Sequence, residues 1–411
     1  MHPSRLPFAV YLLAAGTFLM GTTEFVVAGI LPEVADAFEV SVSQAGLAIT
    51  VFAIGMVVGA PAMALLTLRL PHRVTLVLSL VVFGLGHVGV VLAPDFALVL
   101  AMRAVTALAT GAFWAVAAVV AVRLAGPGRS AGALGIVLGG GMLANALGVP
   151  LGAFLGQAAG WQGPFAVLAV LALALAYPVF RLVPASAAGA PPLAGEVRSL
   201  GSGRMWLALA ACVLINAGVM GMYSFVAPLL TDRAGIAPGA VPLVLLAFGV
   251  GALVGNIVAG RLGDARPFAT ILVILASTLA AAVALLAWST SPAAAVVAVA
   301  FLGLVGLSAN PVLIDLVVRY GSPAAVLPSA LATSMFNLGT AIGSAAIGAG
   351  LASPIGTLAI PLGGAAFAVL VFAPVLVLRA RVRRERRSAR PSDPARRVRT
   401  GPPSRGKTVV R

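Results

Sequence analysis

The stretch Gly21-Thr22-Thr23-Glu24-Phe25 lies in the middle of an apolar run from Pro7 to Leu31, in which Glu24 is the only charged residue. A run of this length can cross a bilayer as a helix. A charged carboxylate at that depth costs roughly 2.5–3.5 kcal/mol on insertion scales, and a protonated carboxyl costs far less, so the site favours the neutral acid. Glu24 is therefore a candidate for taking up and releasing a proton during transport. The alternative is a structural carboxyl bonded to a neighbouring helix.

The composition of the whole chain extends this interpretation to the rest of the sequence. Of the 411 residues, 61% are hydrophobic and 9% are charged. Soluble domains are typically about 45–50% apolar and about 25% charged. The composition excludes a soluble protein and predicts a polytopic membrane protein. The single cysteine, Cys212, excludes an intrachain disulfide. The first apolar run is too long for a cleavable signal and has no small-residue cleavage site behind it, so we expect it to be retained.

Twelve runs are long enough to span a membrane, which takes about 20 apolar residues. They predict an all-α membrane protein, with glycines in many spans that allow close helix packing. The predicted spans are 7–31, 43–66, 74–93, 96–122, 131–157, 163–183, 205–230, 239–262, 268–288, 292–318, 324–351 and 355–378.

The basic residues predict how these spans are oriented. With the N-terminus inside, 24 of the 26 basic residues fall on the cytoplasmic side. Only Arg103, within a span, and Arg233, in an outer loop, do not. Because cytoplasmic loops are enriched in Lys and Arg, we expect a multi-pass protein of the bacterial cytoplasmic membrane with both termini in the cytoplasm.

The chain divides into four segments. We expect a six-helix bundle over 1–183, a cytoplasmic linker rich in Ala, Gly, Pro and Ser over 184–203, and a second bundle over 204–378. The basic segment 379–411 has no apolar periodicity and is predicted to be disordered. Nucleic-acid binding would suit its charge, but a positive-inside tail beside anionic lipid explains it better. We read the formal net charge of +15 in the same way, as a sign of orientation.

Six spans followed by six are a common transporter plan, with the site near the midplane between the halves. The segment Gly21-Thr-Thr-Glu-Phe-Val-Val-Ala-Gly-Ile-Leu-Pro32 is similar to a first-helix signature of the major facilitator superfamily. It resembles a subgroup of twelve-span drug–proton antiporters that includes chloramphenicol, sugar and nucleoside exporters. The resemblance covers residues 7–378. It implies two pseudo-symmetric six-helix bundles, and protonation of Glu24 coupled to substrate exchange.

A second match concerns the family's cytoplasmic gating motif, Gly-x-Leu-Ala-Asp-Arg-x-Gly-Arg-Arg. Its start is kept as Gly260-Arg-Leu-Gly-Asp264 in the C-terminal half. The N-terminal copy, which includes Arg69 and Arg73, has Leu68 where the family usually has Asp. The resemblance implies that an acid at this position locks the cytoplasmic side shut, with Asp264 the stronger candidate. The alternative for both copies is ordinary positive-inside loop chemistry.

Arg103, in Leu98-Val-Leu-Ala-Met-Arg-Ala-Val-Thr, resembles the family's buried fourth-helix arginine, which is implicated in proton transfer. The Gln-Gly that usually follows is replaced by Thr106-Ala107. An arginine stays charged and donates several hydrogen bonds, so inside a bundle it needs an acid or carbonyl partner. The alternative is an arginine near the surface whose side chain extends to water.

The fifth span carries Gly139-Gly-Gly-Met-Leu-Ala-Asn145-Ala-Leu-Gly148-Val-Pro150-Leu-Gly152. This resembles the family's antiporter motif, a glycine-rich helix bent at a Gly-Pro pair, which here is separated by Val149. Proline bends a helix by removing one backbone bond, and glycines allow close contact. Asparagine side chains in the spans are candidates for contacting substrate or, equally, for joining helices by hydrogen bonds. They are Asn145, Asn216 and Asn337. Tyr223 is a further candidate, as part of an aromatic pocket, although packing explains it better.

These features and the resemblance predict a proton-coupled exporter of a small organic drug. Among the substrates of the family, the resemblance favours a chloramphenicol-like antibiotic. Sugar or nucleoside export, export of a self-made antibiotic, and uncoupled facilitation remain alternatives. A buried titrating acid argues against the last, because a facilitator has no need of one. No motif predicts a cofactor, a metal, a nucleotide or catalysis. The expected partners are the small-molecule substrate, protons and the bilayer, with no nucleic acid, and we expect a monomer.

Overall fold

The computed structural model describes residues 6–66, 70–126, 129–185, 199–321 and 327–388. This part of the chain is helical and contains no strand. Twelve of its helical stretches are long and apolar enough to cross a membrane, which confirms the predicted all-α, twelve-span architecture. In a bilayer a helix bonds every backbone group within its own segment, so apolar runs of this length form helices.

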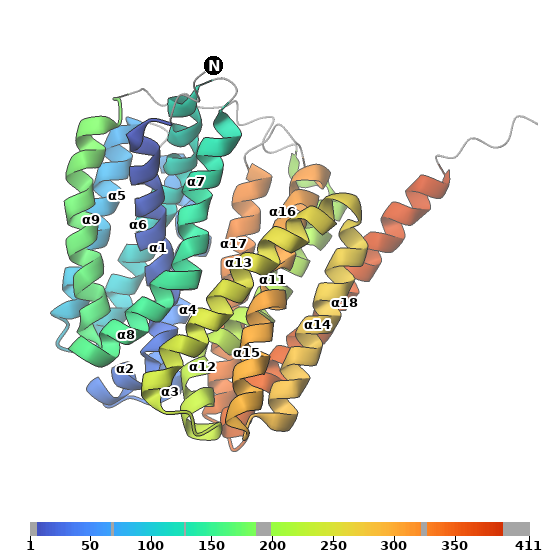
Figure 1. The fold of residues 1–411 in the computed structure, drawn as a ribbon. Coiled ribbons are helices and arrows are strands. Elements are labelled where there is room, and N and C mark those ends of the chain that lie inside the picture. Colours follow the sequence, from blue (N-terminus) through green and yellow to red (C-terminus); the bar gives the residue numbers. More distant parts are fainter. Residues whose placement is uncertain (1–5, 67–69, 127–128, 186–198, 322–326, 389–411) are drawn as a thin grey trace, which may run out of the picture.

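Six spans form the N-terminal bundle, coloured blue to green in Figure 1. The fifth span consists of two helices joined by a π turn, Ala144–Gly148, and two short helices follow the first span. The helices are α1 (Phe8–Gly29), α2 (Leu31–Ala37), α3 (Val42–Ala45), α4 (Leu47–Leu66), α5 (His72–Val91), α6 (Phe96–Ala125), α7 (Ser130–Leu143), α8 (Val149–Ala159) and α9 (Gln162–Leu182).

The other six spans form the C-terminal bundle, coloured light green to red. Two predicted spans, 205–230 and 292–318, are interrupted, because the first helix ends at Ser224 and another ends at Gly306. The helices are α11 (Gly203–Ser224), α12 (Val226–Pro228), α13 (Val241–Ala265), α14 (Pro267–Trp288), α15 (Pro292–Gly306), α16 (Ala309–Tyr320), α17 (Leu327–Leu351) and α18 (Ala359–Ser388).

The predicted tail, 379–411, and the predicted linker, 184–203, lie only partly within the described residues. Helix α18 continues to Ser388, so the first ten residues of the segment predicted to be a disordered tail are helical. Glu385 in this extension pairs with Arg204 at the start of α11, which attaches it to the bundle. Residues 389–411 and most of the predicted linker, 186–198, lie outside the described residues.

Local sequence determines where α6 begins and where α6 and α8 end. The side chain of Asp95 accepts a hydrogen bond from the backbone N of Leu98 at 2.8 Å and caps the start of α6. Gly126 and Gly160 end α6 and α8 with φ of 73° and 77°. Side chains disfavour this left-handed conformation, and glycine adopts it freely.

A line of small residues on the fifth span holds α1 against it. A Cβ added to Gly148 would lie 2.0 Å from the Thr22 hydroxyl oxygen, and one added to Gly152 would lie 2.2 Å from a methyl of Val26. Gly156, four residues further on, and Gly140, eight residues before Gly148, also meet α1 closely, with distances of 2.4 and 2.2 Å from an added Cβ to the nearest atom. Only glycine permits this approach, so the predicted antiporter-motif residues pack directly on the helix that carries Glu24.

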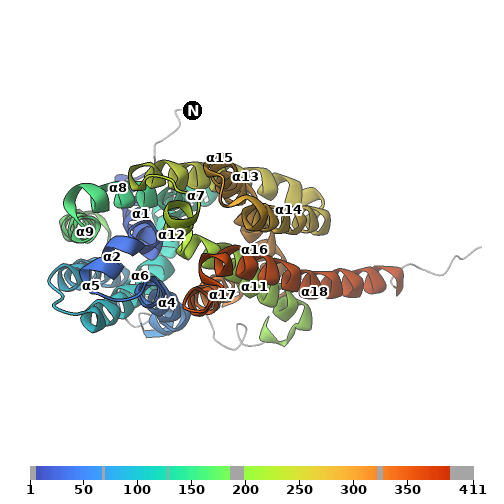
Figure 2. The same cartoon turned by 90° about the horizontal axis from the view of Figure 1, so that it is seen from below.

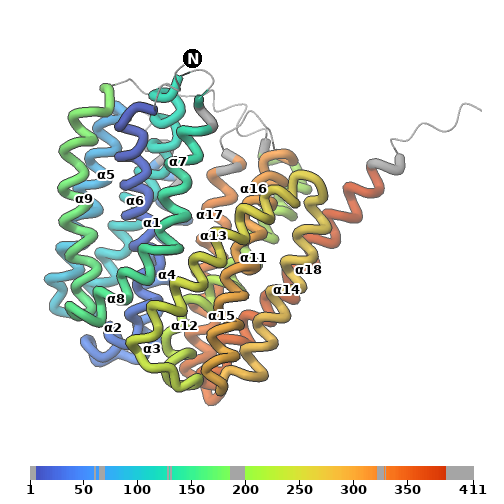
Figure 3. Tube along the Cα trace, viewed as in Figure 1, coloured from blue at the N-terminus to red at the C-terminus, as the bar shows by residue number. Residues whose placement is uncertain are grey.

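The two bundles meet at the end of the molecule opposite the N-terminus, which we call the closed end; towards the other end their helices diverge (Figures 1 and 3). At the closed end the Ser43 hydroxyl donates to the carbonyl of Gly348 at 2.6 Å. The hydroxyls of Thr50 and Ser344 lie 2.8 Å apart. These contacts join α3 and α4 of the first bundle to α17 of the second. Helices α4 and α17 lie side by side in Figure 2.

Candidate functional site

Glu24 lies about three-quarters of the way along α1, and its half-buried side chain has buried residues on either side in sequence. It is the only acidic residue within the spans of the N-terminal bundle. The glycine line of the fifth span presses on α1 just before and after it, at Thr22 and Val26. The acid therefore lies on a helix whose position is set by the antiporter-motif glycines.

Arg103 on α6 is fully buried, which excludes the alternative that its side chain extends to water. Its Nε donates to the carbonyl of Ala48 at 3.1 Å, and its Nη1 donates to the carbonyl and hydroxyl oxygens of Thr23 at 2.8 and 2.9 Å. Its Nη2 donates a longer bond, 3.4 Å, to the main-chain carbonyl of Glu24. Its guanidinium carbon also lies 4.2 Å from the centre of the Phe52 ring. One cation thus joins α1, α4 and α6.

The structure brings Arg103 and Glu24, both named as proton-coupling candidates from the sequence, close together through the main chain of Glu24. The carboxylate lies near enough for electrostatic attraction and makes no direct ion pair with Arg103. Four of the five N–H groups of the guanidinium have an acceptor, so burial leaves its hydrogen bonds largely satisfied. Its charge has no neutralising partner in direct contact, and Glu24 is the acid placed to supply one.

Sequence reasoning missed His87 on α5, because an isolated histidine without a motif gives no signal. In the structure it is buried, and its Nε2 lies 2.7 Å from the Thr23 hydroxyl that also meets Arg103. Its Nδ1 lies 2.7 Å from the carbonyl of Phe83. The polar group around Glu24 therefore draws on four helices, α1, α4, α5 and α6.

The seam between the bundles is filled by aromatic rings next to Glu24. Phe25 on α1 meets the edge of the Tyr223 ring with centroids 6.2 Å apart, and Tyr223 stacks on Phe248 at 4.3 Å. Tyr223, one of the predicted substrate-contacting residues, is buried in this seal. Asn145 lies nearby in the π turn, where a Cβ added to Gly249 of α13 would approach the Asn145 carbonyl to 2.5 Å.

The two remaining asparagines on the candidate list bind backbone carbonyls in this structure. Asn216 on α11 donates from Nδ2 to the carbonyl of Phe336 at 3.2 Å, which joins α11 to α17. Asn337 donates to the carbonyl of Thr333 in its own helix at 3.1 Å. Both Oδ1 atoms are buried without a hydrogen-bond partner. For Asn216 the helix-joining alternative describes the observed contact.

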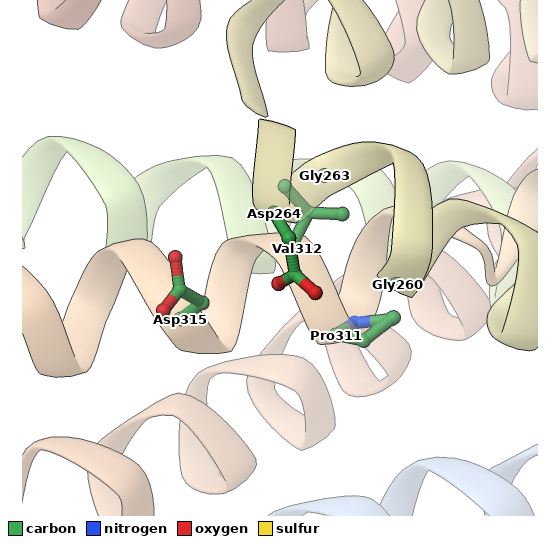
Figure 4. Close-up of a pocket in the computed structure, with 6 residues that line it drawn as sticks. All are labelled: Gly260, Gly263, Asp264, Pro311, Val312 and Asp315. Atoms are coloured by element: carbon green, nitrogen blue, oxygen red, sulfur yellow. The ribbon is translucent and has the colours of Figure 1, made fainter. Parts of the chain in front are cut away.

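The predicted gating residues lie in separate places. Gly260 and Asp264 on α13 line a hollow of about 180 Å³ together with Pro311, Val312 and Asp315 of α16 (Figure 4). Arg73, at the start of α5, lies over the ring of Phe180 with 4.8 Å to the centroid. Helix α5 lies on the side of its bundle away from α13 (Figures 1 and 2), so the structure does not bring these two predicted sites together. Arg69 lies outside the described residues.

Comparison with known proteins shows the family of this chain. The family model described as Major Facilitator Superfamily matches residues 13–327 and 209–408. The chain belongs to the major facilitator superfamily. Members of this superfamily are transporters and not enzymes, so this chain is a multi-pass membrane transporter acting on small molecules.

Curated proteins with similar sequences carry names that refer to drug resistance, transport or efflux. A protein of Streptomyces lividans named "Chloramphenicol resistance protein" is 34% identical over 343 residues, which is 82% of this chain and 88% of that protein. The "Inner membrane transport protein YdhP" of Escherichia coli (strain K12) is 32% identical over 89% of this chain and 94% of its own length. A "Probable sugar efflux transporter" of Mannheimia succiniciproducens is 30% identical over 83% and 86%.

Solved structures of the superfamily share the fold at low sequence identity. A bacterial homologue of the human lysosomal transporter Spinster, solved in an inward-facing and occupied conformation, matches with a TM-score of 0.70 and 16% identity. The match covers 92% of this chain and 96% of that one. It supports the two-bundle fold and carries no information on substrate.

Proposed function

We propose that this transporter exports a small organic drug in exchange for protons, and that Glu24 carries the proton. The observation that supports this most is the placement of Glu24. It is the only acid within the spans of the first bundle, it lies beside the buried Arg103, and it stands on the helix held by the antiporter-motif glycines. Keeping a carboxyl charged in this environment costs free energy, so protonation readily changes its charge state.

The proposed cycle is alternating access. Facing outward, Glu24 takes a proton from outside and the drug leaves. The protonated carrier then turns inward, releases the proton to the cytoplasm and accepts a new drug molecule. The proton gradient supplies the energy, because the sequence contains no nucleotide-binding motif.

The positive-inside rule assigns the structure to one state of this cycle. If the arginine-rich loops face the cytoplasm, the closed end is the outer end and the structure is in an inward-facing state. The Phe25–Tyr223–Phe248 stack is then part of the outer seal. Gly260 and Asp264 lie at the opposite, cytoplasmic end of α13, where we propose that they act as a gate when that side closes. The gating role proposed for Arg69 and Arg73 belongs to the N-terminal copy of the motif, and α5, which carries Arg73, lies away from α13 (Figures 1 and 2).

We infer that the preferred substrate is a neutral, fairly apolar antibiotic of the chloramphenicol type. The name of the Streptomyces lividans relative supports this, as does a first bundle with one membrane acid, which offers little to attract cations. A sugar is the second candidate, supported by the name of the Mannheimia succiniciproducens relative. An uncoupled facilitator is the third, and the placement of Glu24 argues against it.

Expression in an efflux-deficient bacterial host tests the substrate class. Resistance to phenicols should rise more than resistance to large cationic dyes, and Glu24→Gln should abolish the increase at equal protein level. Strong dye resistance with unchanged phenicol susceptibility would reverse the ranking. Sugar export would show instead as relief from growth inhibition by a toxic sugar analogue.

A further inference from the structure

The polar group around Arg103 contains a chain of hydrogen bonds that sequence analysis did not suggest. Arg103 Nη1 lies 2.9 Å from the Thr23 hydroxyl oxygen, which lies 2.7 Å from His87 Nε2. His87 Nδ1 lies 2.7 Å from the carbonyl oxygen of Phe83. All three side chains are buried, with exposed fractions of 0–1%.

Elementary chemistry fixes the direction of every bond in this chain. A carbonyl oxygen only accepts, so His87 Nδ1 carries a hydrogen and donates to Phe83. In the neutral ring Nε2 is then an acceptor, and the Thr23 hydroxyl must donate to it. The hydroxyl oxygen is left to accept from Arg103, which can only donate. The chain therefore runs in one direction, from Arg103 through Thr23 and His87 to Phe83.

The same geometry holds His87 neutral and still. A protonated ring would donate from Nε2 to the hydroxyl oxygen that already accepts from Arg103, and would bring a second buried cation next to the first. The ring also lies between two aromatic rings, Phe83 at 4.2 Å and Phe165 at 5.8 Å between centroids, which limits its rotation. The Thr23 hydroxyl is thereby fixed as an acceptor for Arg103.

We propose that Thr23 and His87 are positioning residues for the proton-coupling site. They hold Nη1 of Arg103 on α1, and the second N–H of Nη2, which has no acceptor, can then bind the Glu24 carboxylate once that group loses its proton and its side chain turns toward Arg103. Thr23 and Glu24 are adjacent in sequence, so the hydroxyl that orients the arginine moves with the acid. This inference rests on the proposed function of Glu24.

Other charged or titratable groups lie on the helices that pack against α1 and α5, and none of them takes part in this hydrogen-bond chain. Apart from Arg103, Glu24 and His87, they are Tyr11 on α1, Glu33 and Asp36 on α2, His72 and Arg73 on α5, Arg123 on α6, Tyr177 and Arg181 on α9, Arg204, Cys212 and Tyr223 on α11, and Arg261 and Asp264 on α13.

The test compares Thr23→Val, which keeps the shape and removes the hydroxyl, with Thr23→Ser, which keeps the hydroxyl. Drug efflux from proteoliposomes is measured against pH. Without the hydroxyl, Arg103 is poorly aimed and the carboxylate is less well stabilised, so the pH midpoint of transport should move upward by about one unit. Thr23→Ser should restore the wild-type midpoint, and His87→Leu should behave like Thr23→Val, with His87→Gln intermediate.

Two controls separate this inference from structural damage and from the proposed function. Drug affinity at a pH well above both midpoints should stay within about twofold in Thr23→Val, because Glu24 is then ionised in both proteins. The Thr23 hydroxyl is itself fully buried and bonded to Arg103 and His87. An unchanged midpoint in Thr23→Val, or a Thr23→Ser variant as shifted as Thr23→Val, overturns the positioning role while Glu24→Gln still loses its pH dependence. A Glu24→Gln variant with a wild-type pH profile would overturn the proposed function and the positioning role with it.

Discussion

At the scale of single residues, the site depends on the absence of side chains as much as on their presence. Arg103 reaches the carbonyls of Thr23 and Glu24 because α1 lies close to its neighbours. That closeness comes from Gly148 and Gly152, where any side chain would collide with Thr22 or Val26. The glycines of the predicted antiporter motif therefore contact the helix that carries Glu24, the proposed proton carrier.

Replacing Gly148 by alanine should push α1 away from the fifth span. The added methyl would lie 2.0 Å from the Thr22 hydroxyl oxygen, so the helices must separate. Overpacking of this kind typically costs about 1–3 kcal/mol, and we expect a lower melting temperature in detergent together with impaired transport.

Gly139→Ala is the matched control in the same span, because a Cβ there has nothing within 4 Å. It should leave both properties near wild type. Equal losses in the two variants would show that the fifth span needs glycine for flexibility and not for contact with α1.

Much of the residue-scale site could be read from the sequence, and the limit has a physical cause. Glu24 and Arg103 stand out because a charge inside an apolar run is costly and therefore rare. His87 and Thr23 carry no such signal. Their role depends on how α1, α5 and α6 are rotated about their axes, and spans that are apolar on all sides have no periodicity that fixes that rotation.

At the scale of helices, α3 and α4 contact α17 at the closed end. The hydroxyl oxygens of Thr50 on α4 and Ser344 on α17 lie 2.8 Å apart. The Ser43 hydroxyl on α3 donates to the carbonyl of Gly348, one turn beyond Ser344 along α17. Alternating access requires α4 and α17 to part when the opposite end closes.

The double variant Thr50→Cys/Ser344→Cys should form a disulfide under mild oxidation and stop transport. Reduction should restore it, and each single variant should be unaffected by oxidant. The native Cys212 is fully buried and should not compete for pairing. A crosslinked protein that transports at the full rate would show that this end does not open.

Asp264 offers the corresponding prediction for the other end. It lines the hollow between α13 and α16, where closure of the cytoplasmic side would bring a partner to its charge. Asp264→Asn should slow turnover while leaving drug affinity largely unchanged. Asp315→Asn is the control, since Asp315 already pairs with Arg319 at 2.7 Å within α16. Normal turnover in Asp264→Asn would argue against a gate at this position.

The helices themselves were predictable, and their interruptions were not. Hydropathy and length predict twelve spans, and the structure has twelve. The ends of α11 at Ser224 and of α15 at Gly306, and the π turn at Ala144–Gly148, fall inside apolar runs. A break there depends on the surrounding helices, which satisfy the backbone groups that the break exposes.

At the scale of the whole molecule, the two bundles touch at one end, and the side of the membrane that this end faces decides which access state the structure represents. The arginine distribution predicts that it faces outward, with both termini in the cytoplasm. The N-terminal start of α1 and the end of α18 lie at the diverging end of the bundles (Figure 1).

Reporter fusions test this orientation. A C-terminal reporter that is active only in the cytoplasm should be active, and one that is active only in the periplasm should be silent. Fusions after Gly160, at the closed end, should give the reverse pattern. A periplasmic signal from the C-terminal fusion would show the inverted topology, in which the structure is outward-facing and the Gly260–Asp264 end of α13 lies on the periplasmic side.

The most direct test of the proton-carrying role is drug-induced proton release from purified protein in detergent. Adding a phenicol to unbuffered wild-type protein at a pH where Glu24 is protonated should release protons in proportion to bound drug. Glu24→Gln keeps the shape and cannot titrate, so it should bind the drug, release no protons and bind independently of pH. Glu24→Asp should release protons with partial transport activity. If Glu24→Gln released protons on drug binding and carried out uphill efflux as the wild-type protein does, the account would be contradicted and the proton would belong to another group.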